Sequence, residues 1–166
     1  MARRNEAVLI REAGPQELDE IESLVKTAYR EFQPIFPAER WRAWMDNIWE
    51  TVHSGVGVAI VAEAWGKIRG VIKFYPHAGQ AGLGTWPKES ASMRILAVHP
   101  KNRGQGYGTL LVRECVRRAQ ALKLPQLYLY TGTFMLAARH IYESLGFVRA
   151  PEFDRDPGPI AYRLDL

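Results

Sequence analysis

Three glycines alternate with other residues at positions 104, 106 and 108, between Arg103 and a run with helical periodicity. An apolar, strand-like segment that begins at Met93 precedes them. A strand, a glycine-rich turn and the start of a helix together form a place for a phosphate. Glycine lets the backbone approach an anion closely, and the first free N–H groups of the helix point at it. The spacing therefore predicts a phosphate-binding loop over residues 103–109.

Two common nucleotide-binding loops do not match this segment. A Walker loop ends in Gly-Lys-Ser/Thr, but Gly108 is followed directly by Thr109, with no lysine between them. The dinucleotide fingerprint G-x-G-x-x-G requires its third glycine at position 109, where a threonine stands. Both loops are excluded, so the phosphate belongs to another kind of ligand.

Segment 103–108, Arg-Gly-Gln-Gly-Tyr-Gly, resembles the acetyl-CoA loop of the GNAT superfamily of N-acetyltransferases, whose pattern is Gln/Arg-x-x-Gly-x-Gly/Ala. A second segment, 138–147, reads Ala-Arg-His-Ile-Tyr-Glu-Ser-Leu-Gly-Phe and resembles the family motif A-x-x-x-Y-E-x-x-G-F. The two motifs stand in the family's order and at its separation. The resemblance covers essentially the whole chain in element order and is strongest over residues 93–147.

The resemblance implies acetyl-CoA as co-substrate and a set of cofactor-binding residues. The loop amides of 103–109 would bind the CoA diphosphate, and a Cβ at any of the three glycines would hold the backbone away from it. A bulge would separate the strand over 96–98 from its neighbour, so that its main chain pairs with the pantetheine amides. The implied cofactor-binding residues are Leu96, Val98, Arg103, Gly104, Gln105, Gly106, Gly108 and Thr109.

The implied reaction is attack of a neutral amine on the thioester carbonyl, with expulsion of the CoA thiolate. The thiol has a solution pKa of about 8.5, so a positioned proton donor helps the thiolate to leave. By the resemblance this catalytic residue is Tyr142, whose phenol (pKa ~10 in solution) stays protonated at neutral pH. A backbone N–H near Val98 would polarise the carbonyl.

Two positions depart from the family pattern. Many relatives have an asparagine seven residues before the tyrosine, where this chain has Met135, so that cofactor contact is lost. Many also have a glutamate six residues before the last valine of the strand, acting on the amine, where this chain has Ser92. Glu89, a chain of waters, or an acceptor of naturally low pKa are the open alternatives for removing the amine proton.

The elements that must position these residues follow from hydrophobic periodicity. Helical stripes predict helices over 17–32, 38–52, from the glycines to about 123, and over 135–145. Apolar or alternating runs predict strands over 7–11, 56–65, 71–75, from 93 toward 100, and over 126–131, 147–148 and 160–164. The order β-α-α-β-β-β-α-β-α-β-β gives the α+β class, and by resemblance a GNAT-like acyl-CoA N-acyltransferase fold with a mixed central β-sheet flanked by helices. A hairpin at Gly66-Lys67 and a parallel, right-handed crossover within 93–131 are expected.

Composition limits the alternatives. The chain has 166 residues, 47% hydrophobic and 24% charged, which predicts a single domain over 1–166. No apolar run approaches the ~20 residues of a membrane span, and no signal peptide is recognised. A lone Cys115 on an apolar helix face predicts a buried thiol and a reducing, cytoplasmic location. The net charge of +4 is scattered, which argues against nucleic acid, and the four histidines lack metal-ligand spacing.

The acceptor is expected to contact the first two helices and the loop over 76–90, by family resemblance. This region carries six aromatic residues: Tyr29, Phe32, Phe36, Trp41, Trp44 and Trp49. Either they pack the helices onto the sheet, or they form the wall of an acceptor pocket in which Asp46 or Glu50 attracts a cationic amine.

The sequence thus favours an acetyl-CoA-dependent N-acetyltransferase acting on a primary amine of a small molecule or a protein. The partners are expected to be this acceptor, with neither nucleic acid nor membrane, and the resemblance allows a homodimer. The alternative is a non-catalytic acyl-CoA-binding sensor or interaction module. Ser92 and Met135 favour that alternative, whereas Tyr142 argues against it.

Overall fold

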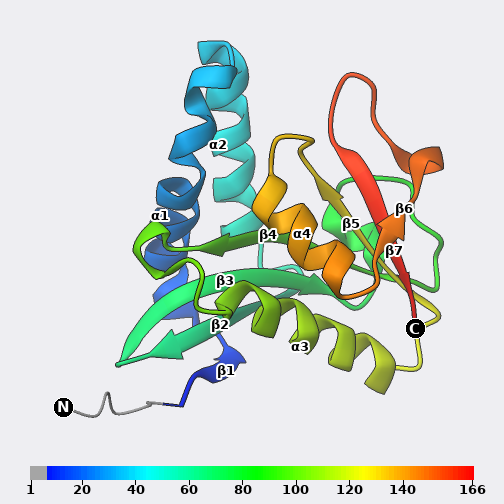
Figure 1. The fold of residues 1–166 in the computed structure, drawn as a ribbon, viewed down its shortest axis with the longest axis horizontal. Helices are drawn as coiled ribbons and strands as arrows, with labels where there is room; N and C mark the ends of the chain where they lie inside the picture. The colour runs from blue at the N-terminus through cyan, green and yellow to red at the C-terminus, as the bar shows by residue number, and fades with distance from the viewer. Residues whose placement is uncertain (1–6) are drawn as a thin grey trace.

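The computed structural model describes residues 7–166, which form a mixed sheet with helices on both faces (Figure 1). Its seven strands run in the order β1-β2-β3-β4-β5-β7-β6. The strands are β1 (Leu9–Glu12), β2 (Val58–Ala64), β3 (Lys67–Tyr75), β4 (Ala91–Val98), β5 (Gln126–Thr131), β6 (Val148–Arg149) and β7 (Ile160–Asp165). The helices are α1 (Leu18–Tyr29), α2 (Ala38–His53), α3 (Tyr107–Ala121) and α4 (Leu136–Ser144). The predicted α+β class and element order are confirmed.

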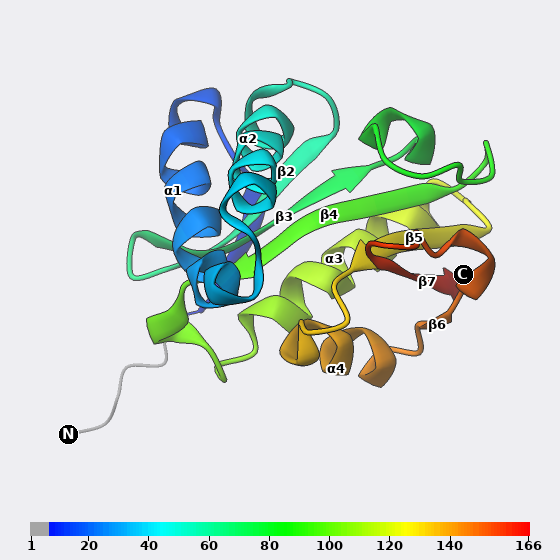
Figure 2. The same ribbon diagram turned by 90° about the horizontal axis from the view of Figure 1, so that it is seen from above.

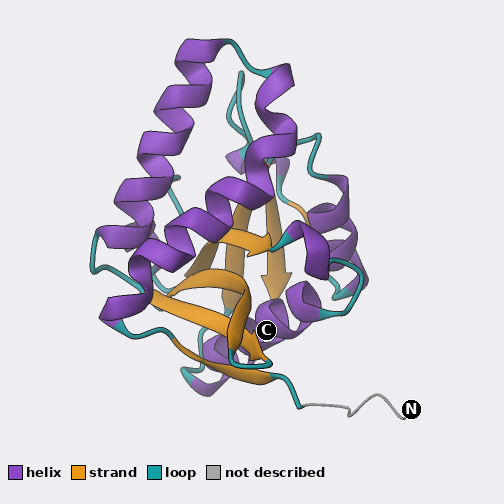
Figure 3. Cartoon of the chain, turned by 90° about the vertical axis from the view of Figure 1, so that its left-hand side faces the viewer, coloured by secondary structure: helices purple, strands orange, loops and turns teal. Residues whose placement is uncertain are grey.

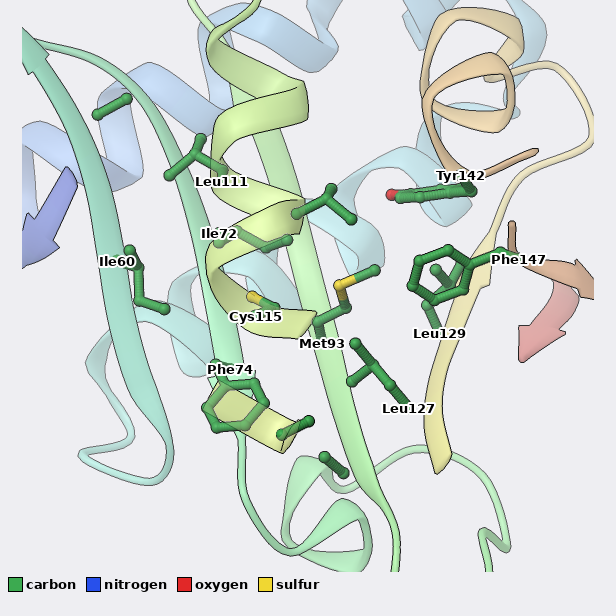
Figure 4. Close-up of a cluster of buried hydrophobic side chains, with 14 of the residues drawn as sticks. Ile60, Ile72, Phe74, Met93, Leu111, Cys115, Leu127, Leu129, Tyr142 and Phe147 are labelled. Carbon is green, nitrogen blue, oxygen red and sulfur yellow. The ribbon is translucent and has the colours of Figure 1, made fainter. Parts of the chain in front are cut away.

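Two hydrophobic cores lie on the two faces of the sheet. Figure 2 shows helices α1 and α2 on one side of the strands and α3 and α4 on the other, and Figure 3 shows helices around the sheet in a view from another side. Along β2, Ile60 and Ala62 belong to the core under α3 and α4, whereas Val61 between them belongs to the core under α1 and α2. This alternation follows from the two-residue period of a strand. Figure 4 shows the first core, in which Cys115 is fully buried, as expected.

The predicted hairpin between β2 and β3 is present, with its turn one residue earlier than expected. Trp65 and Gly66 form the turn, with φ angles of 58° and 65°. A two-residue type I′ turn requires positive φ at both positions, which fits this pair. Lys67 is already paired with Ala64, so β3 begins four residues before the predicted start at position 71.

Strand β4 has a different partner on each side, and this difference creates an opening. It pairs antiparallel with β3, but parallel with β5 only over Ala91–Met93. Ile95 has a φ of 53°, and the register places Ile95 and Leu96 together opposite Ile72. An extra residue of this kind is a β-bulge, which bends the strand. From the bulge onward, β4 separates from β5.

The segments around the helices refine the expected boundaries. The predicted helix over 17–32 ends at Tyr29 and continues as a 3-10 segment over Arg30–Ile35, which contains Pro34. Proline lacks the N–H that an α-helix needs, which explains the change. None of the described helices has the length and apolar character needed to cross a membrane.

Candidate active site

The start of helix α3 presents backbone N–H groups to an open cavity. Gly106 is its N-cap, with a φ of 85° and no side-chain hydrogen bond capping the helix. The first helical hydrogen bond runs from the N–H of Leu110 to the carbonyl of Gly106, at 3.0 Å. The N–H groups of residues 107–109 precede that bond and have no acceptor within the helix. Together with the helix dipole, they form an anion-binding end.

The three glycines of this loop serve two different purposes. Gly104 and Gly106 have φ angles of 74° and 85°, and a Cβ at either would meet no atom within 4 Å. Gly108 has no such φ, but a Cβ there would lie 2.8 Å from Cδ1 of Ile141. Gly104 and Gly106 therefore shape the backbone beside open space. Gly108 also lets α3 pack closely against α4, a role that the sequence did not indicate.

A cavity of about 580 Å³ lies beside this loop. It brings together all but one of the residues that the sequence proposed for the cofactor: Leu96, Val98, Arg103, Gly104, Gly106, Gly108 and Thr109. Gln105 is exposed and does not line it. The opposite wall comes from the start of α4 and from Phe134, Met135 and Leu136, which periodicity alone did not identify.

Arg103 attaches the loop to the end of helix α1. Its Nη1 lies 2.7 Å from Oε1 of Glu31, and its Nη2 donates to the carbonyl of Ala28 at 2.9 Å. A cation at the carboxyl end of a helix is favourable because the helix dipole is negative there. In this structure the Arg103 side chain therefore positions the loop, while its main chain borders the cavity.

The edge of β4 that faces away from β3 is accessible from the same cavity. The N–H of His99 donates to the carbonyl of Arg69 on the β3 side, at 2.9 Å. Because main-chain groups alternate in direction along a strand, those of Val98 and Leu96 face the other side, where β5 has already separated. Tyr29, a residue that the sequence placed in the aromatic set, donates its hydroxyl to the Leu96 carbonyl at 3.0 Å.

Tyr142 lies where β4 and β5 separate. Its side chain is 5% exposed, and its ring packs 5.8 Å from Phe147 and 6.1 Å from Tyr162, between ring centroids. Figure 4 shows it projecting from α4 toward β4. It borders a small hollow of about 40 Å³, also lined by Tyr29, Leu96 and other residues. Burial raises the pKa of the Tyr142 hydroxyl above its usual range, so the group keeps its proton at neutral pH.

A second cavity, of about 490 Å³, lies on the other side of this hollow. Tyr29, Phe134 and Met135 line both large cavities, so the two meet there. Residues from α2, β4, β5 and the loops over 81–86 and 157–159 complete the lining. One cavity thus borders the helix N-terminus, the other borders an aromatic wall, and Tyr142 lies between them.

The aromatic set divides between the two expectations. Tyr29, Phe36 and Trp44 line the second cavity, with Trp44 stacked 5.2 Å from Tyr29 between ring centroids. Trp41 packs behind them, edge-on to Trp44. Trp49 is 51% exposed and stacks on a histidine instead. Some of the aromatic residues thus form the cavity wall, whereas others pack against the helices.

The carboxylates considered for the acceptor lie elsewhere. Neither Asp46 nor Glu50 lines the second cavity, and Glu89 is exposed and lines neither large cavity. Ser92 does line the second cavity, where its Oγ donates to the carbonyl of Ala78 at 3.4 Å. The second cavity is therefore lined without an acidic side chain, which differs from the expectation of an attraction by Asp46 or Glu50.

One group of potential metal ligands lies apart from both large cavities. The ligand atoms of Asp19, Glu22 and His53 lie within 4.8 Å of one another. Glu22 already accepts from Lys26 at 2.6 Å and contacts His53 at 2.9 Å, so an ion pair and a hydrogen bond explain its position. None of these residues lines a cavity described above.

Solved structures with the same fold include acetyltransferases. PaiA N-acetyltransferase from Thermoplasma acidophilum, solved in complex with coenzyme A, is similar with a TM-score of 0.73 and 13% identity, over 96% of this chain and 99% of the other. A GNAT-family acetyltransferase from Brucella melitensis, solved in complex with acetyl-CoA, is similar with a TM-score of 0.63 and 20% identity, over 98% and 90%. The fold is that of N-acetyltransferases.

The sequence comparison gives the family. The model of the acetyltransferase (GNAT) family matches residues 18–147, and the chain belongs to this family. Mycothiol acetyltransferase from Acidothermus cellulolyticus is 33% identical over 88 residues, which are 53% of this chain. The match spans only 26% of the length of that curated relative. The family expected from the two sequence motifs is confirmed.

Proposed function

We propose that the chain is an acetyl-CoA-dependent N-acetyltransferase that acts on a primary amine of a small molecule or a protein. One observation carries this proposal: the open edge of β4 and the uncapped start of α3 border one cavity, and Tyr142 lies where that cavity meets a second one. The family supports it, as do the coenzyme A and acetyl-CoA bound by the two solved relatives. The buried, lone Cys115 supports a cytoplasmic location.

The first cavity has the chemistry that CoA requires. The N–H groups of residues 107–109 suit the diphosphate, because their dipole end attracts anions and no side chain occupies it. The main-chain groups of Leu96 and Val98 suit the pantetheine amides, which would pair with them as an added strand does. Gly104, Gly106 and Thr109 leave room beside these donors.

Acetyl-CoA supplies an acetyl thioester, whose C–S bond breaks as the C–N bond to the amine forms. Tyr142 is the proton donor to the leaving sulfur in this proposal, since its hydroxyl is protonated and reaches the junction of the cavities. Tyr29 fixes the Leu96 carbonyl at the bulge, which keeps the edge of β4 in position. The aromatic residues of the second cavity line the space that the acceptor would occupy.

The amine must also lose a proton before it attacks. Ser92 is no base at neutral pH, and Glu89 lies outside both large cavities. Two arginines, Arg40 and Arg94, line the second cavity without an acidic side chain among its lining residues. Positive charge nearby favours the neutral form of an amine and so lowers its pKa. We infer that the acceptor amine releases its proton to water in this cavity rather than to a carboxylate.

The test is thiol release from acetyl-CoA across a panel of primary amines, with Tyr142→Phe as the informative variant. General acid catalysis contributes about 10²- to 10⁴-fold, so we expect the turnover number of Tyr142→Phe to fall within that range. The dissociation constant of CoA should change little, because only one oxygen is removed. Tyr128→Phe is the matched control, since Tyr128 is equally buried but lines none of the cavities.

Two results would contradict the proposal in different ways. Full activity of Tyr142→Phe would reduce Tyr142 to a packing residue. Tight binding of CoA without turnover of any amine would instead support a non-catalytic acyl-CoA-binding module.

A further inference from the structure

The second cavity, which we call the acceptor cavity, carries positive charge without a neighbouring carboxylate. Arg40 at the start of α2 and Arg94 on β4 line it, and no aspartate or glutamate does. Within residues 7–166, neither arginine forms an ion pair, although other arginines of the chain do. Arg40 is exposed, whereas Arg94 is half-buried, and a half-buried guanidinium without a carboxylate partner favours an anionic ligand.

Arg94 is held in place by neutral acceptors alone. Its Nη1 donates to the carbonyl of Ala81 at 2.8 Å, and its Nη2 donates to Oδ1 of Asn47 at 2.7 Å. These two bonds fix the guanidinium between α2 and the loop after β3. They leave its charge uncompensated and further N–H donors available. The side chain is therefore oriented before any ligand binds.

A second cation lies directly opposite Arg94 in the sheet. Lys73 on β3 is the cross-strand partner of Arg94 and is only 3% exposed. Its ammonium group donates to the carbonyl of Thr51 and to Oγ of Ser54, the latter at 3.1 Å. Like charges directly opposite each other destabilise a sheet. The fold therefore keeps an unfavourable pair of cations, of which Arg94 lines the acceptor cavity and Lys73 does not.

A polar side chain of the same cavity lacks a partner. Thr131, at the end of β5, is 5% exposed, and its Oγ1 is buried with no hydrogen-bond partner in the described part of the chain. Buried hydroxyl groups are nearly always hydrogen-bonded in folded proteins. Thr131 and Arg94 line the same cavity, but the Oγ1 atom of Thr131 is fully buried, so Arg94 is the group that a ligand can reach.

We propose that the acceptor is an amine that also carries a carboxylate on an apolar or aromatic scaffold. This inference rests on the proposed function and specifies its substrate class. Arg94 and Arg40 bind the carboxylate, and Phe36, Trp44 and other aromatic side chains contact the scaffold. The planar guanidinium matches a carboxylate through two parallel hydrogen bonds.

The experiment compares acids with their neutral amides as acceptors. Thiol release from acetyl-CoA is measured with each common α-amino acid and with its carboxamide, which have similar shapes but differ in charge and in the pKa of the amine, so each kcat/KM is calculated per neutral amine. For the wild type we expect kcat/KM to favour the acid by at least about tenfold, the lower end for a charge-assisted hydrogen bond. The acid-to-amide ratio is the readout, because a general loss of folding would reduce both rates together.

Four variants locate the acid preference. In Arg94→Gln the ratio should fall close to one, whereas Arg94→Lys should keep part of the preference. Arg40→Gln should lower the ratio too, and Arg40 makes no ion pair or side-chain hydrogen bond in the described chain that its loss would disturb. Arg113→Gln removes the same charge from an exposed position of α3 outside both large cavities and should leave the ratio unchanged.

The inference is overturned if the wild type uses amides as well as acids, or if Arg113→Gln lowers the ratio as much as Arg94→Gln does. If no amine is turned over at all, the proposed function fails, and binding then decides the inference separately. Calorimetry with N-acetylphenylalanine and its amide should show acid-selective binding that Arg94→Gln abolishes. Equal binding of both compounds, or no binding of the acid, would overturn the assignment.

Discussion

The left-handed backbone at Gly106 allows the energetics of folding and of binding to be separated. For a residue with a Cβ, this conformation costs about 1–2 kcal/mol. A Cβ at Gly106 would meet no atom within 4 Å, so no clash adds to that strain. Gly106→Ala should therefore lose about 1–2 kcal/mol of the free energy of unfolding. At roughly 2–4 °C per kcal/mol for a chain of this size, Tm should fall by about 2–8 °C.

The open space around Gly106 belongs to the cavity proposed for CoA. A methyl group there lies beside the N–H groups of residues 107–109 and keeps an anion away from them. Loss of one charge-assisted hydrogen bond corresponds to at least about a tenfold rise in the dissociation constant of CoA. Calorimetry with CoA measures this constant, and thermal unfolding without ligand measures the Tm.

The control for this variant is Gly66→Ala in the β2–β3 turn. Gly66 has a φ of 65°, a Cβ there also meets nothing within 4 Å, and the residue lines no cavity described above. It should lose a similar Tm without any change in CoA affinity. If both variants lose the same Tm and both bind CoA as the wild type does, the glycine loop is a connector and the anion-binding role assigned to it is refuted.

Three further predictions concern stability. Tyr29→Phe removes the hydrogen bond to the Leu96 carbonyl and should lower the free energy of unfolding by about 0.5–1.5 kcal/mol in urea titrations. Burial and then Arg94 lower the pKa of Lys73 to about 8, so the unfolded chain binds an extra proton between about pH 8 and its usual 10.5. Stability should rise with pH across that window, and Lys73→Met should abolish the rise. The Arg11 side chain is the main cause that lowers the pKa of Glu17 from 4.5 to about 2. The contribution of ionised Glu17 to the free energy of unfolding should be complete above about pH 4.5 and lost as pH falls toward 2. Arg11→Gln should weaken this acid dependence.

The half of the site proposed to bind CoA could be predicted because the residues that form it are close together in the sequence. A strand, the glycines and the helix after them adjoin in sequence, so Gly104 and Gly106 indicated a turn with positive φ beside a helix start. The role of Gly108 was not accessible in this way. It depends on Ile141, more than thirty residues along the chain, and only the packing of α3 on α4 brings the two together.

The predicted strand boundaries were wrong where the surrounding structure, and not the local sequence, determines how strands pair. The segment from Lys67 to Gly70 carries too many polar residues to indicate a strand, yet β3 begins at Lys67. The tight turn at Trp65 and Gly66 forces the chain directly back along β2, and pairing then extends through those residues. Turn geometry outweighed the weak local propensity.

The acceptor half could not be predicted because it is assembled from distant segments. Arg40, Arg94 and Thr131 come from α2, β4 and β5, and no periodicity relates them. The positive residues looked scattered along the sequence. Carboxylates pair with Arg11, Arg103, Arg117, Arg118, Arg149 and Arg163 elsewhere in the fold.

Because of that pairing, the net charge of +4 does not tell where in the fold positive charge acts. Where a carboxylate is present, an arginine adds little to the local field, because the two charges largely cancel beyond a few ångströms. Arg94 has no such partner within residues 7–166 and stands opposite Lys73, where its charge adds to the larger effect of burial in lowering the pKa of Lys73. The acceptor cavity is therefore electropositive because no carboxylate among its lining residues neutralises Arg94. A count of charged residues in the sequence does not reveal this property.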